Sequence, residues 1–417
     1  MVMSAINRRR WQNFRANKRA FWSLIIFSVL FGLSLFAEFL ANDKPVLVNY
    51  RGELRMPIFN FYSEQSFGGD FATEAVYRDV EVRCLIKTGG VADDCFDDPD
   101  AAIAAVDAGT YAHPDFDKGW LIWPPIRYSY NTPVDLRVLE QDGLITIDPD
   151  DAFPYAHPSP PSAVNWLGTD DGARDVLARV IHGFRLSIIY TLIVTSVASV
   201  IGIIAGAIQG YFGGWTDLLF QRFLEIFGAI PNLYVIIILF AILGRSFWLL
   251  VFLSILFGWP ALTGVVRAEF LRARNLEYVR AAQALGVSNW TIMFRHMLPN
   301  AMVATLTMLP FIVTGTIGAL AGLDFLGYGL PSSAPSLGEM TLQAKQNLQA
   351  PWLGFTAFFT FAIMLSLLVF VFEGVRDAFD PRKVFVVGGA VSEDPGDSVF
   401  IETETADGAK AVRETKI

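Results

Sequence analysis

The sequence predicts an all-α integral membrane protein with six transmembrane helices and a large irregular module between the first and second of them. Two observations support this fold class. The 417-residue chain is 53% hydrophobic but only 18% charged, and its apolar residues gather in long runs. A helix that crosses a bilayer needs about 20 consecutive apolar residues. Six runs approach that length, at 21–41, 186–212, 226–244, 247–266, 300–323 and 352–372.

The first run is preceded by a basic segment, residues 1–20, that contains no acidic residue. By the positive-inside rule, this charge places the amino terminus in the cytoplasm. A cleavable signal peptide is the alternative, but its apolar core spans about 7–15 residues and is shorter than the run at 21–41. We therefore expect a retained membrane helix.

Six crossings from a cytoplasmic start place residues 42–166 outside the cytoplasm and the carboxyl terminus inside it. The charge distribution agrees, because residues 42–170 hold 22 of the 41 acidic side chains but 9 of the 32 basic ones. Within the module we expect short strands at 44–50 and 143–147. An acidic, alanine-rich stretch at 91–109 indicates a short helix or a mobile insertion.

Two cysteines, Cys84 and Cys95, both lie in this predicted external module. An oxidising compartment permits a disulfide between them, which would stabilise the module by about 3 kcal/mol in the chain-entropy model. Two free thiols are the alternative. Metal binding is not expected, because no C-x2-C spacing or histidine cluster accompanies the pair.

Residues 167–188 are predicted to form an amphipathic helix at the outer face, leading into the second run. Its acidic residues, Asp170, Asp171 and Asp175, are interpreted as ordinary chemistry of a helix start, where negative charge is favourable. Small residues then mark two helix faces on which another helix backbone can approach closely. These expected packing positions are Gly202, Gly206, Gly210, Gly318 and Gly322.

The segment from Glu277 to Asn300 is polar, and it lies between two apolar runs. Charged and polar groups are excluded from lipid, so the segment is expected at the membrane surface. Asn275 is predicted to cap its first helix, Gly286 to end that helix in a left-handed conformation, and Ser288 to cap a second helix. Such a helix–turn–helix shelf, with its small-residue face, is suited to a groove on another protein. An ordinary loop between membrane helices is the alternative.

The same segment fits the pattern E-x3-A-A-x3-G followed by L-P, and it resembles the EAA motif of membrane subunits of binding-protein-dependent ABC importers. That resemblance implies that the shelf, near 273–299, is the coupling helix that docks on a cytoplasmic ATPase. One departure from the broad pattern is His296, which agrees with R-H-x-L-P in the peptide branch. The residues that match the motif are Glu277, Ala281, Ala282, Gly286, Leu298 and Pro299.

Residues 167–383 resemble the dipeptide and oligopeptide permease branch throughout, from G-T-D-x4-D-V-L to E-G-V-R-D-A-F-D-P-R. RWQNFRANKRAFW, FYSEQSFGG and WPPIRYSYNT resemble one subgroup, whose importers also admit peptide–nucleotide antibiotics of the microcin C type. The resemblance implies a type I ABC importer permease domain in a bacterial inner membrane, a periplasmic module at 42–166, and import of oligopeptides. The tail, 384–417, lies outside the resemblance and is expected to be disordered in the cytoplasm.

No G-x4-G-K-[ST] loop occurs, so we expect the chain to bind no nucleotide. We also expect no catalytic residue and no metal site, and hence no enzyme. ATP and Mg would be used by a partner ATPase. The partners that the resemblance implies are a second homologous permease, a cytoplasmic ABC ATPase with two nucleotide-binding domains, a periplasmic peptide-binding protein and the lipid bilayer, with no nucleic acid.

Other functions remain open beside this one. An importer of the same type could carry another substrate, such as nickel. A channel or secondary transporter would need ionisable residues inside the membrane, and the runs at 186–212, 300–323 and 352–372 contain none. A membrane-tethered enzyme would need a catalytic set in the module, and none is recognisable there.

Overall fold

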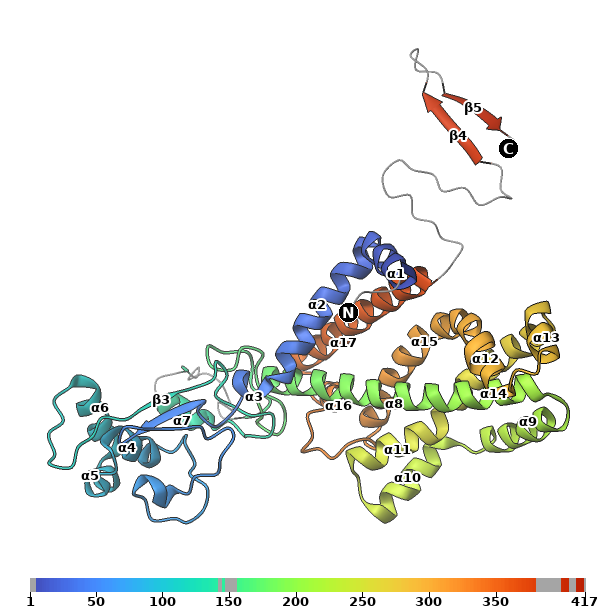
Figure 1. The fold of residues 1–417 in the computed structure, drawn as a ribbon. Helices are drawn as coiled ribbons and strands as arrows, with labels where there is room; N and C mark the ends of the chain where they lie inside the picture. Colours follow the sequence, from blue (N-terminus) through green and yellow to red (C-terminus); the bar gives the residue numbers. More distant parts are fainter. Residues whose placement is uncertain (1–4, 142–144, 147–155, 380–398, 405–409, 416–417) are drawn as a thin grey trace.

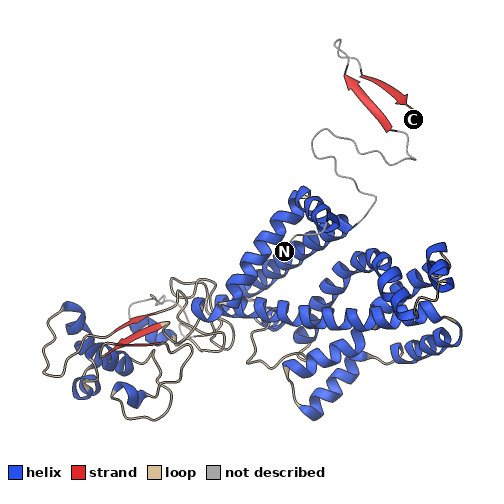
Figure 2. Cartoon of the chain, viewed as in Figure 1, coloured by secondary structure: helices blue, strands red, loops and turns tan. Residues whose placement is uncertain are grey.

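The computed structural model of the chain describes residues 5–141, 145–146, 156–379, 399–404 and 410–415. Helices make up nearly all of the bundle, and short strands occur only in the module and in the tail of the described chain (Figure 2). In this described part, five helical segments are long and apolar enough to cross a membrane, or up to six if one bent pair counts as a span. The five are Lys18–Leu35, Val176–Phe212, Phe247–Ala273, Asn289–Phe325 and Pro351–Phe379.

The first span is shorter than the run predicted at 21–41. Helix α2 (Lys18–Leu35) ends at Phe36, and a separate turn of helix, α3 (Ala37–Leu40), follows it. Glu38 lies in α3, and its carboxylate accepts two hydrogen bonds of 2.9 Å from the guanidinium of Arg185. This bidentate ion pair holds the end of the first span against the helix that begins the permease bundle.

Helix α8 (Val176–Phe212) is the longest element, and at 1.5 Å per residue it extends about 55 Å. It includes most of the helix predicted at 167–188 and continues without a break into the second run, as expected, but it begins at Val176, so the predicted start at residue 167 is wrong. The side chain of Asp175 caps α8 by accepting a hydrogen bond of 2.8 Å from the backbone N–H of Ala178. Residues 167–174 form turns instead.

The third predicted run is divided into two helices. α9 (Gly214–Gly228) and α10 (Asn232–Leu243) are bent by 65° relative to each other, and Pro231 immediately precedes α10. Proline limits the preceding residue to extended conformations, which favours a break there. The expectation of six crossings is therefore met only if this bent pair is counted as one span.

The remaining bundle helices continue across the predicted boundaries. α11 (Phe247–Gly258) runs directly into α12 (Pro260–Ala273), and α14 (Asn289–Thr291) runs through a π-helix, η2 (Ile292–Met297), into α15 (Leu298–Phe325). Between α12 and α14 lies α13 (Glu277–Ala284). The chain ends its bundle with α16 (Leu337–Gln346) and α17 (Pro351–Phe379).

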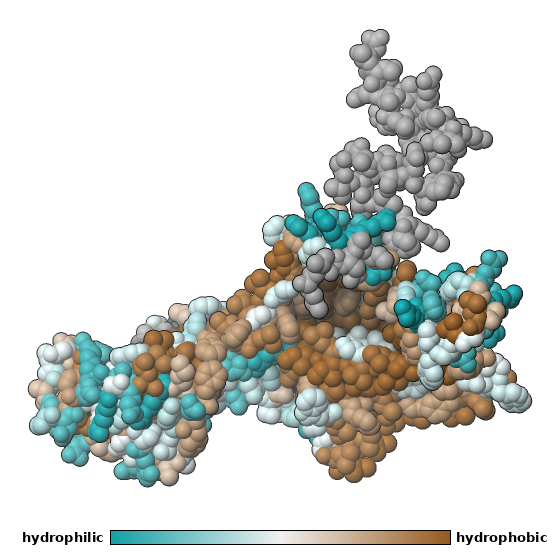
Figure 3. Space-filling view, viewed as in Figure 1, coloured by the Kyte–Doolittle hydropathy of each residue, from teal (hydrophilic) through white to brown (hydrophobic). Residues whose placement is uncertain are grey.

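Figure 1 shows how these helices are arranged. α2 lies along α17, α12 lies along α8, and α15 contacts α8, α12, α16 and α17. α13 lies at one end of α8, and the module of residues 42–166 lies beyond the opposite end. Apolar colour covers the middle of the molecule in Figure 3, and hydrophilic colour marks the module, α13 and α1 (Ala5–Ala16). This distribution is typical of a protein that spans a bilayer between two aqueous ends.

The module is built on a three-stranded antiparallel sheet in the order β2-β1-β3. β1 (Leu47–Tyr50) pairs with β2 (Glu53–Arg55) and, with Val48 opposite Leu121, with β3 (Trp120–Ile122). β1 lies within the strand predicted at 44–50. Of the strand predicted at 143–147, only Ile145 and Thr146 are described, and neither belongs to a strand.

Short helices cover the sheet of the module. The stretch predicted as a helix or an insertion forms α5 (Ala92–Asp97) and α6 (Pro99–Ala108), which pack against α4 (Val80–Thr88). A 3-10 turn, η1 (Glu64–Phe67), and α7 (Leu136–Gln141) complete it. Its core joins sheet and helices through the fully buried side chains of Val48, Phe67, Leu85 and Ile86.

Two segments of the tail at 384–417 are described, and the disorder expected for the tail stays a prediction. β4 (Val399–Glu404) and β5 (Lys410–Thr415) pair as an antiparallel hairpin, with Val399 opposite Thr415. The other tail residues lie outside the described part of the chain.

Candidate functional site

The candidate site is the turn at the end of α13. Gly286 adopts a left-handed conformation with φ of +73°, as predicted for the residue that ends this helix. The N–H of Gly286 donates to the carbonyl of Gln283 over 3.0 Å, and that of Val287 donates to the carbonyl of Ala282 over 3.1 Å. This pair of bonds is the Schellman motif, in which glycine avoids the steric cost of a side chain.

The two predicted helix caps have different outcomes. Ser288 caps α14, because its hydroxyl oxygen accepts a hydrogen bond of 3.3 Å from the N–H of Thr291. The prediction for Asn275 is wrong, since Leu276 occupies the cap position of α13 and makes no side-chain bond there. A turn of backbone after α12, in which the N–H of Leu276 donates to the carbonyl of Ala273, sets that start instead.

α13 is seated on a hydrophobic cluster formed by α8, α12 and η2. Val279 is fully buried there, together with Phe270 of α12 and Met293 of η2. Polar bonds reinforce the seat. Tyr211 at the end of α8 donates to the side-chain oxygen of Asn289 over 2.7 Å, and its own hydroxyl accepts from the amide of Gln283 over 3.4 Å. The turn is therefore held from both sides by the ends of transmembrane helices.

The outward surface of α13 carries mostly small and polar residues. Glu277, Ala281 and Gly286 are exposed, and so is Pro299 at the far side of the turn. Ala282 and Leu298 instead pack partly against the cluster below. Four of the six predicted motif residues are therefore exposed, and the other two pack against the hydrophobic cluster. Leu285 projects from the same turn with 83% of its surface exposed.

The second helix of the shelf is not a separate element, because η2 connects it directly to α15. The π-helical segment Ile292–Met297 lies between the Gly286 turn and α15, and its helical turn is wider than that of an α-helix. Single π-helical turns inside α-helices are rare and frequently lie at functional sites. Periodicity did not predict this turn, since an apolar and basic run such as IMFRHM fits an α-helix equally well.

The glycines of α8 lie directly against α12. A Cβ atom added at Gly202, Gly206 or Gly210 would come within 2.6 Å of the carbonyl oxygen of Trp259, Thr263 or Arg267, respectively. No side chain fits at such a distance from a backbone atom. The backbone of α12 packs against the glycine face of α8, and α12 leads into α13. The crossing therefore connects the transmembrane helices to the turn at the end of α13.

Gly318 and Gly322 of α15 behave differently. A Cβ atom added at either residue would meet no heavy atom of the described chain within 4 Å. Packing at these two positions is therefore not made within the described part of the chain, and close approach of another helix to this face stays a prediction. The physical reason is that α15 turns this face away from the helices of its own bundle.

A cluster of buried charges lies at the end of α8 opposite to α13. From the sequence alone, its Asp170 indicates helix-start chemistry. Arg179 is fully buried and donates to Glu339 of α16 over 2.8 Å, and its Nε lies 3.4 Å from the buried carboxylate of Asp170. Arg174 contacts the same carboxylate over 2.8 Å. Burial raises the pKa of the Glu339 carboxyl, against the attraction of the two guanidiniums. The cluster clamps α16 to the start of α8.

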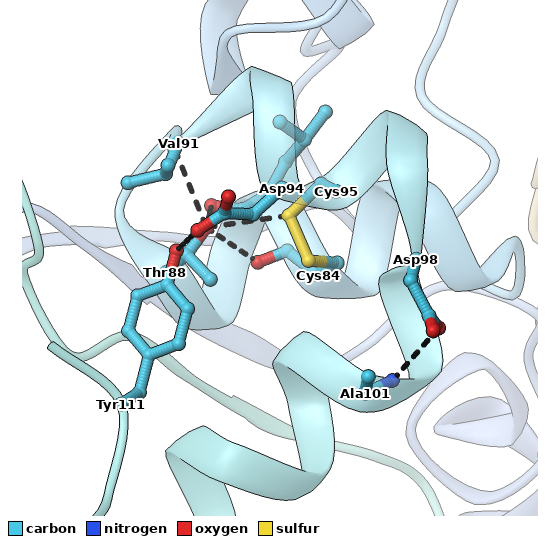
Figure 4. Close-up of a disulfide and its surroundings, with 9 residues drawn as sticks. Cys84, Thr88, Val91, Asp94, Cys95, Asp98, Ala101 and Tyr111 are labelled. Atoms are coloured by element: carbon cyan, nitrogen blue, oxygen red, sulfur yellow. Dashed lines mark hydrogen bonds between the residues drawn. A yellow bond between two sulfur atoms is a disulfide. The ribbon is translucent and has the colours of Figure 1, made fainter. Parts of the chain in front are cut away.

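Cys84 and Cys95 are joined in a disulfide between α4 and α5, with their Cα atoms 5.5 Å apart (Figure 4). Both residues are fully buried. Nearby, the hydroxyl of Tyr111 donates to Asp94 over 2.6 Å and fastens the following loop to α5. In the described part of the chain no group of three or more His, Cys, Asp or Glu residues is placed to hold a metal ion.

Comparisons with known proteins agree with this arrangement. Residues 198–384 match the family "Binding-protein-dependent transport system inner membrane component", and residues 7–57 match the "N-terminal TM domain of oligopeptide transport permease C". The chain is 51% identical to the peptidoglycan transport system permease protein YejE of Agrobacterium fabrum, over 92% of this chain and 94% of that protein.

Two further relatives extend the comparison. The inner membrane ABC transporter permease protein YejE of Escherichia coli is 49% identical over 91% of this chain and 98% of its own length. The oligopeptide transport system permease protein OppC of Lactococcus lactis is 34% identical over 52% of this chain and 75% of its own length. The chain therefore belongs to the family of inner-membrane permeases of binding-protein-dependent ABC transport systems, and the YejE permeases are its relatives over more than nine-tenths of its length.

Proposed function

We propose that this chain is the permease subunit of an ATP-driven importer of short peptides, and that α13 with the Gly286 turn receives the motion of a partner ATPase. The observation that supports the proposal is the seat of α13. The exposed turn is held because Val279 of α13 is buried in the cluster with residues of α8 and α12, and because Tyr211 of α8 accepts a hydrogen bond from Gln283. Coupling between sites needs a rigid connected element, and the turn and these two long helices form one.

The partners follow from this division of labour. A cytoplasmic ATPase with two nucleotide-binding domains, of the YejF type, would dock on α13. A second permease of the YejB type would complete the pathway, and a periplasmic binding protein of the YejA type would deliver the substrate. The amino and carboxyl termini would then lie in the cytoplasm and residues 42–166 in the periplasm. The permease itself hydrolyses no ATP in this scheme.

The substrate class rests on the relatives. Their names mention oligopeptides and peptidoglycan, and peptidoglycan fragments carry short peptides. We therefore propose peptides, with or without an attached sugar, and include peptide–nucleotide antibiotics of the microcin C type. An importer of nickel remains the alternative within the family.

The test is a reconstitution in proteoliposomes of the chain with its copurifying subunits and the binding protein. The expected result is that an ATPase copurifies and that labelled tripeptide or muropeptide accumulates only with ATP. ATP-driven accumulation of nickel without peptide uptake would overturn the substrate class and keep the importer. Passage of substrate down its gradient by the chain alone, without a copurifying ATPase, would overturn the importer itself.

The side of the membrane is tested separately by thiol labelling. In a chain with Cys84 and Cys95 replaced by serine, single cysteines are introduced at exposed positions, Thr110 in the module and Ala284 in α13. An impermeant reagent added to the periplasmic side should label Thr110→Cys and spare Ala284→Cys. Labelling in the reverse order would contradict the proposed topology.

A further inference from the structure

The amino-terminal helix α1 carries a charge pattern that neither the bundle nor the coupling turn uses. Residues 8–19 contain six basic side chains, and no acidic residue occurs before the first span. Five of the six are exposed: Arg8, Arg9, Arg15, Lys18 and Arg19. None of these five lies within ion-pair distance of a carboxylate in the part of the chain that the structure describes. Elsewhere in the bundle, cations such as Arg185 and Arg267 have carboxylate partners.

α1 is nevertheless a fixed helix. Phe14 is 5% exposed and packs beside Gly374 of α17, where a Cβ atom would come within 3.0 Å of its ring and 2.2 Å of the Ala20 methyl. The guanidinium of Arg10 lies 4.2 Å from the ring centre of Phe379. These contacts use one face of α1 to bind the end of α17. They leave the exposed cations on the outward surface at a defined position.

The level of these cations relative to the membrane follows from α2. Asn17 separates α1 from α2 and caps α2 by accepting a hydrogen bond of 3.3 Å from Ala20. Lys18 is the first residue of the apolar span, and Trp22, one turn later, is 59% exposed. Tryptophan is enriched at the interface between lipid and water. Figure 3 shows the hydrophilic surface of α1 directly beside the apolar surface of α2.

We propose that α1 and the first turn of α2 form a docking surface for the headgroups of anionic phospholipids. The cations lie at the depth where a lipid phosphate lies, and Trp11, 43% exposed and stacked on Phe14, adds an interfacial aromatic ring to the same helix. Clusters of lysine and arginine beside a transmembrane helix attract anionic lipids electrostatically. Continuity with the span favours lipid over an acidic protein partner, because the exposed apolar side chains of α2, such as Trp22 and Ile26, begin directly beside these cations.

The proposal requires only that α2 crosses the membrane, and it does not depend on the transported substrate. It is tested on the whole purified complex in bilayers that contain trace spin-labelled phosphatidylglycerol or phosphatidylcholine. Electron paramagnetic resonance then measures the relative association of each lipid with the protein. We expect a preference for phosphatidylglycerol of about fivefold, which is the effect of one cation near an anionic surface. High salt should reduce this preference, because the Debye length shortens.

Two variants locate the effect. In the first, Arg8, Arg9, Lys18 and Arg19 are all replaced by glutamine, since their side chains make no hydrogen bond, ion pair or ring contact within the described part of the chain. In the matched control, the same positions carry Arg8→Lys, Arg9→Lys, Lys18→Arg and Arg19→Lys. The glutamine variant should lose most of the lipid preference, and the control should keep it.

Three results would overturn the proposal. These are equal association of the two lipids with the unmodified complex, an unchanged preference in the glutamine variant, and loss of a copurifying protein from that variant with its lipid preference intact. Thiol labelling at Ala284→Cys verifies that the glutamine variant keeps the orientation of the parent. If the glutamine variant changes its orientation, the proposal is tested by the salt dependence of the unmodified complex instead. A lipid preference that is independent of salt then contradicts the proposal.

Discussion

Arg179 of α8 and Glu339 of α16 form a hydrogen-bonded ion pair of 2.8 Å, in which the arginine side chain is fully buried and the glutamate is 16% exposed. The two residues are separated by 160 positions in the chain. Asp170 lies 3.4 Å from the same guanidinium. The pair fastens α16 to the start of α8, the longest helix of the bundle.

Removing this pair should weaken the fold. Glu339→Ala is expected to lower the free energy of unfolding by about 2 kcal/mol, because a hydrogen bond to a buried charge is lost. Asp170 remains as a partner and limits the loss. The measurement is unfolding of the purified chain in detergent, followed by circular dichroism. As a control, Glu225→Ala removes the exposed pair with Arg222 and should cost less than about 0.5 kcal/mol. Equal losses in the two variants would contradict the clamp.

The crossing of α8 and α12 should tolerate no side chain. Gly206→Val places atoms where a Cβ alone would lie 2.6 Å from the carbonyl oxygen of Thr263, and overpacking of this kind costs about 1–3 kcal/mol. Gly318→Val makes the same change at a position with no atom within 4 Å. We expect lower thermal stability of the purified chain in the first variant only. A stable Gly206→Val chain would show that the helices do not pack this closely.

Acid should weaken the contact between Glu38 and Arg185. Partial burial is the largest single influence and by itself would raise the pKa of the Glu38 carboxyl. The hydrogen bonds from Arg185, a backbone hydrogen bond and the positive charge of Arg185 together outweigh burial and hold this pKa below its ordinary value. A lowered folded-state pKa means that the stabilisation is present above the unfolded pKa of about 4.3. It is lost as the pH falls through the folded-state value.

Glu38→Gln should therefore make unfolding less sensitive to acid. Because Glu38 is 42% exposed, the effect should stay below about 1 kcal/mol. Melting temperatures measured across the acidic range test this, with Arg185→Gln as the matched variant that should flatten the profile equally. Variants that retain the full acid dependence of the parent would assign that dependence to other carboxylates.

The disulfide should be present in the isolated protein. Closing a loop with a sequence separation of 11 is expected to stabilise the module by about 3 kcal/mol. Mass spectrometry without reductant should find Cys84 and Cys95 linked, and Cys84→Ser should lower the stability of the module while leaving the bundle folded. Complete alkylation of both thiols without reductant would contradict the bond.

The sequence predicts those features that depend on local pattern. Apolar runs give the spans, and glycine and serine give the Gly286 turn and the Ser288 cap, because each follows from the conformation of neighbouring residues. The chain from α11 to α15 is less predictable. Its helices continue past the ends of the apolar runs. The polar segment there is held by buried side chains such as Val279.

Features that depend on distant contacts are not predicted by the sequence. Taken alone, Asp170 indicates helix-start chemistry, because nothing near it indicates that Arg179 and Glu339 complete a buried cluster. The predicted first run continues through Glu38, whose partner, Arg185, lies 147 positions away in the chain. A single sequence gives no signal for such pairs, since each member alone resembles an ordinary surface charge.

The central claim is that ATP-driven motion enters the permease through the Gly286 turn, and ATP-dependent peptide uptake by reconstituted Gly286 variants tests it most directly. Gly286→Val forces a β-branched side chain into φ of +73°, which is strongly disfavoured, whereas Gly286→Asn keeps a residue that tolerates this conformation. The account predicts that the valine complex assembles but loses at least about tenfold in uptake, a barrier of about 1.4 kcal/mol, while the asparagine complex remains active. Uptake at the parental rate by the valine variant would contradict the account.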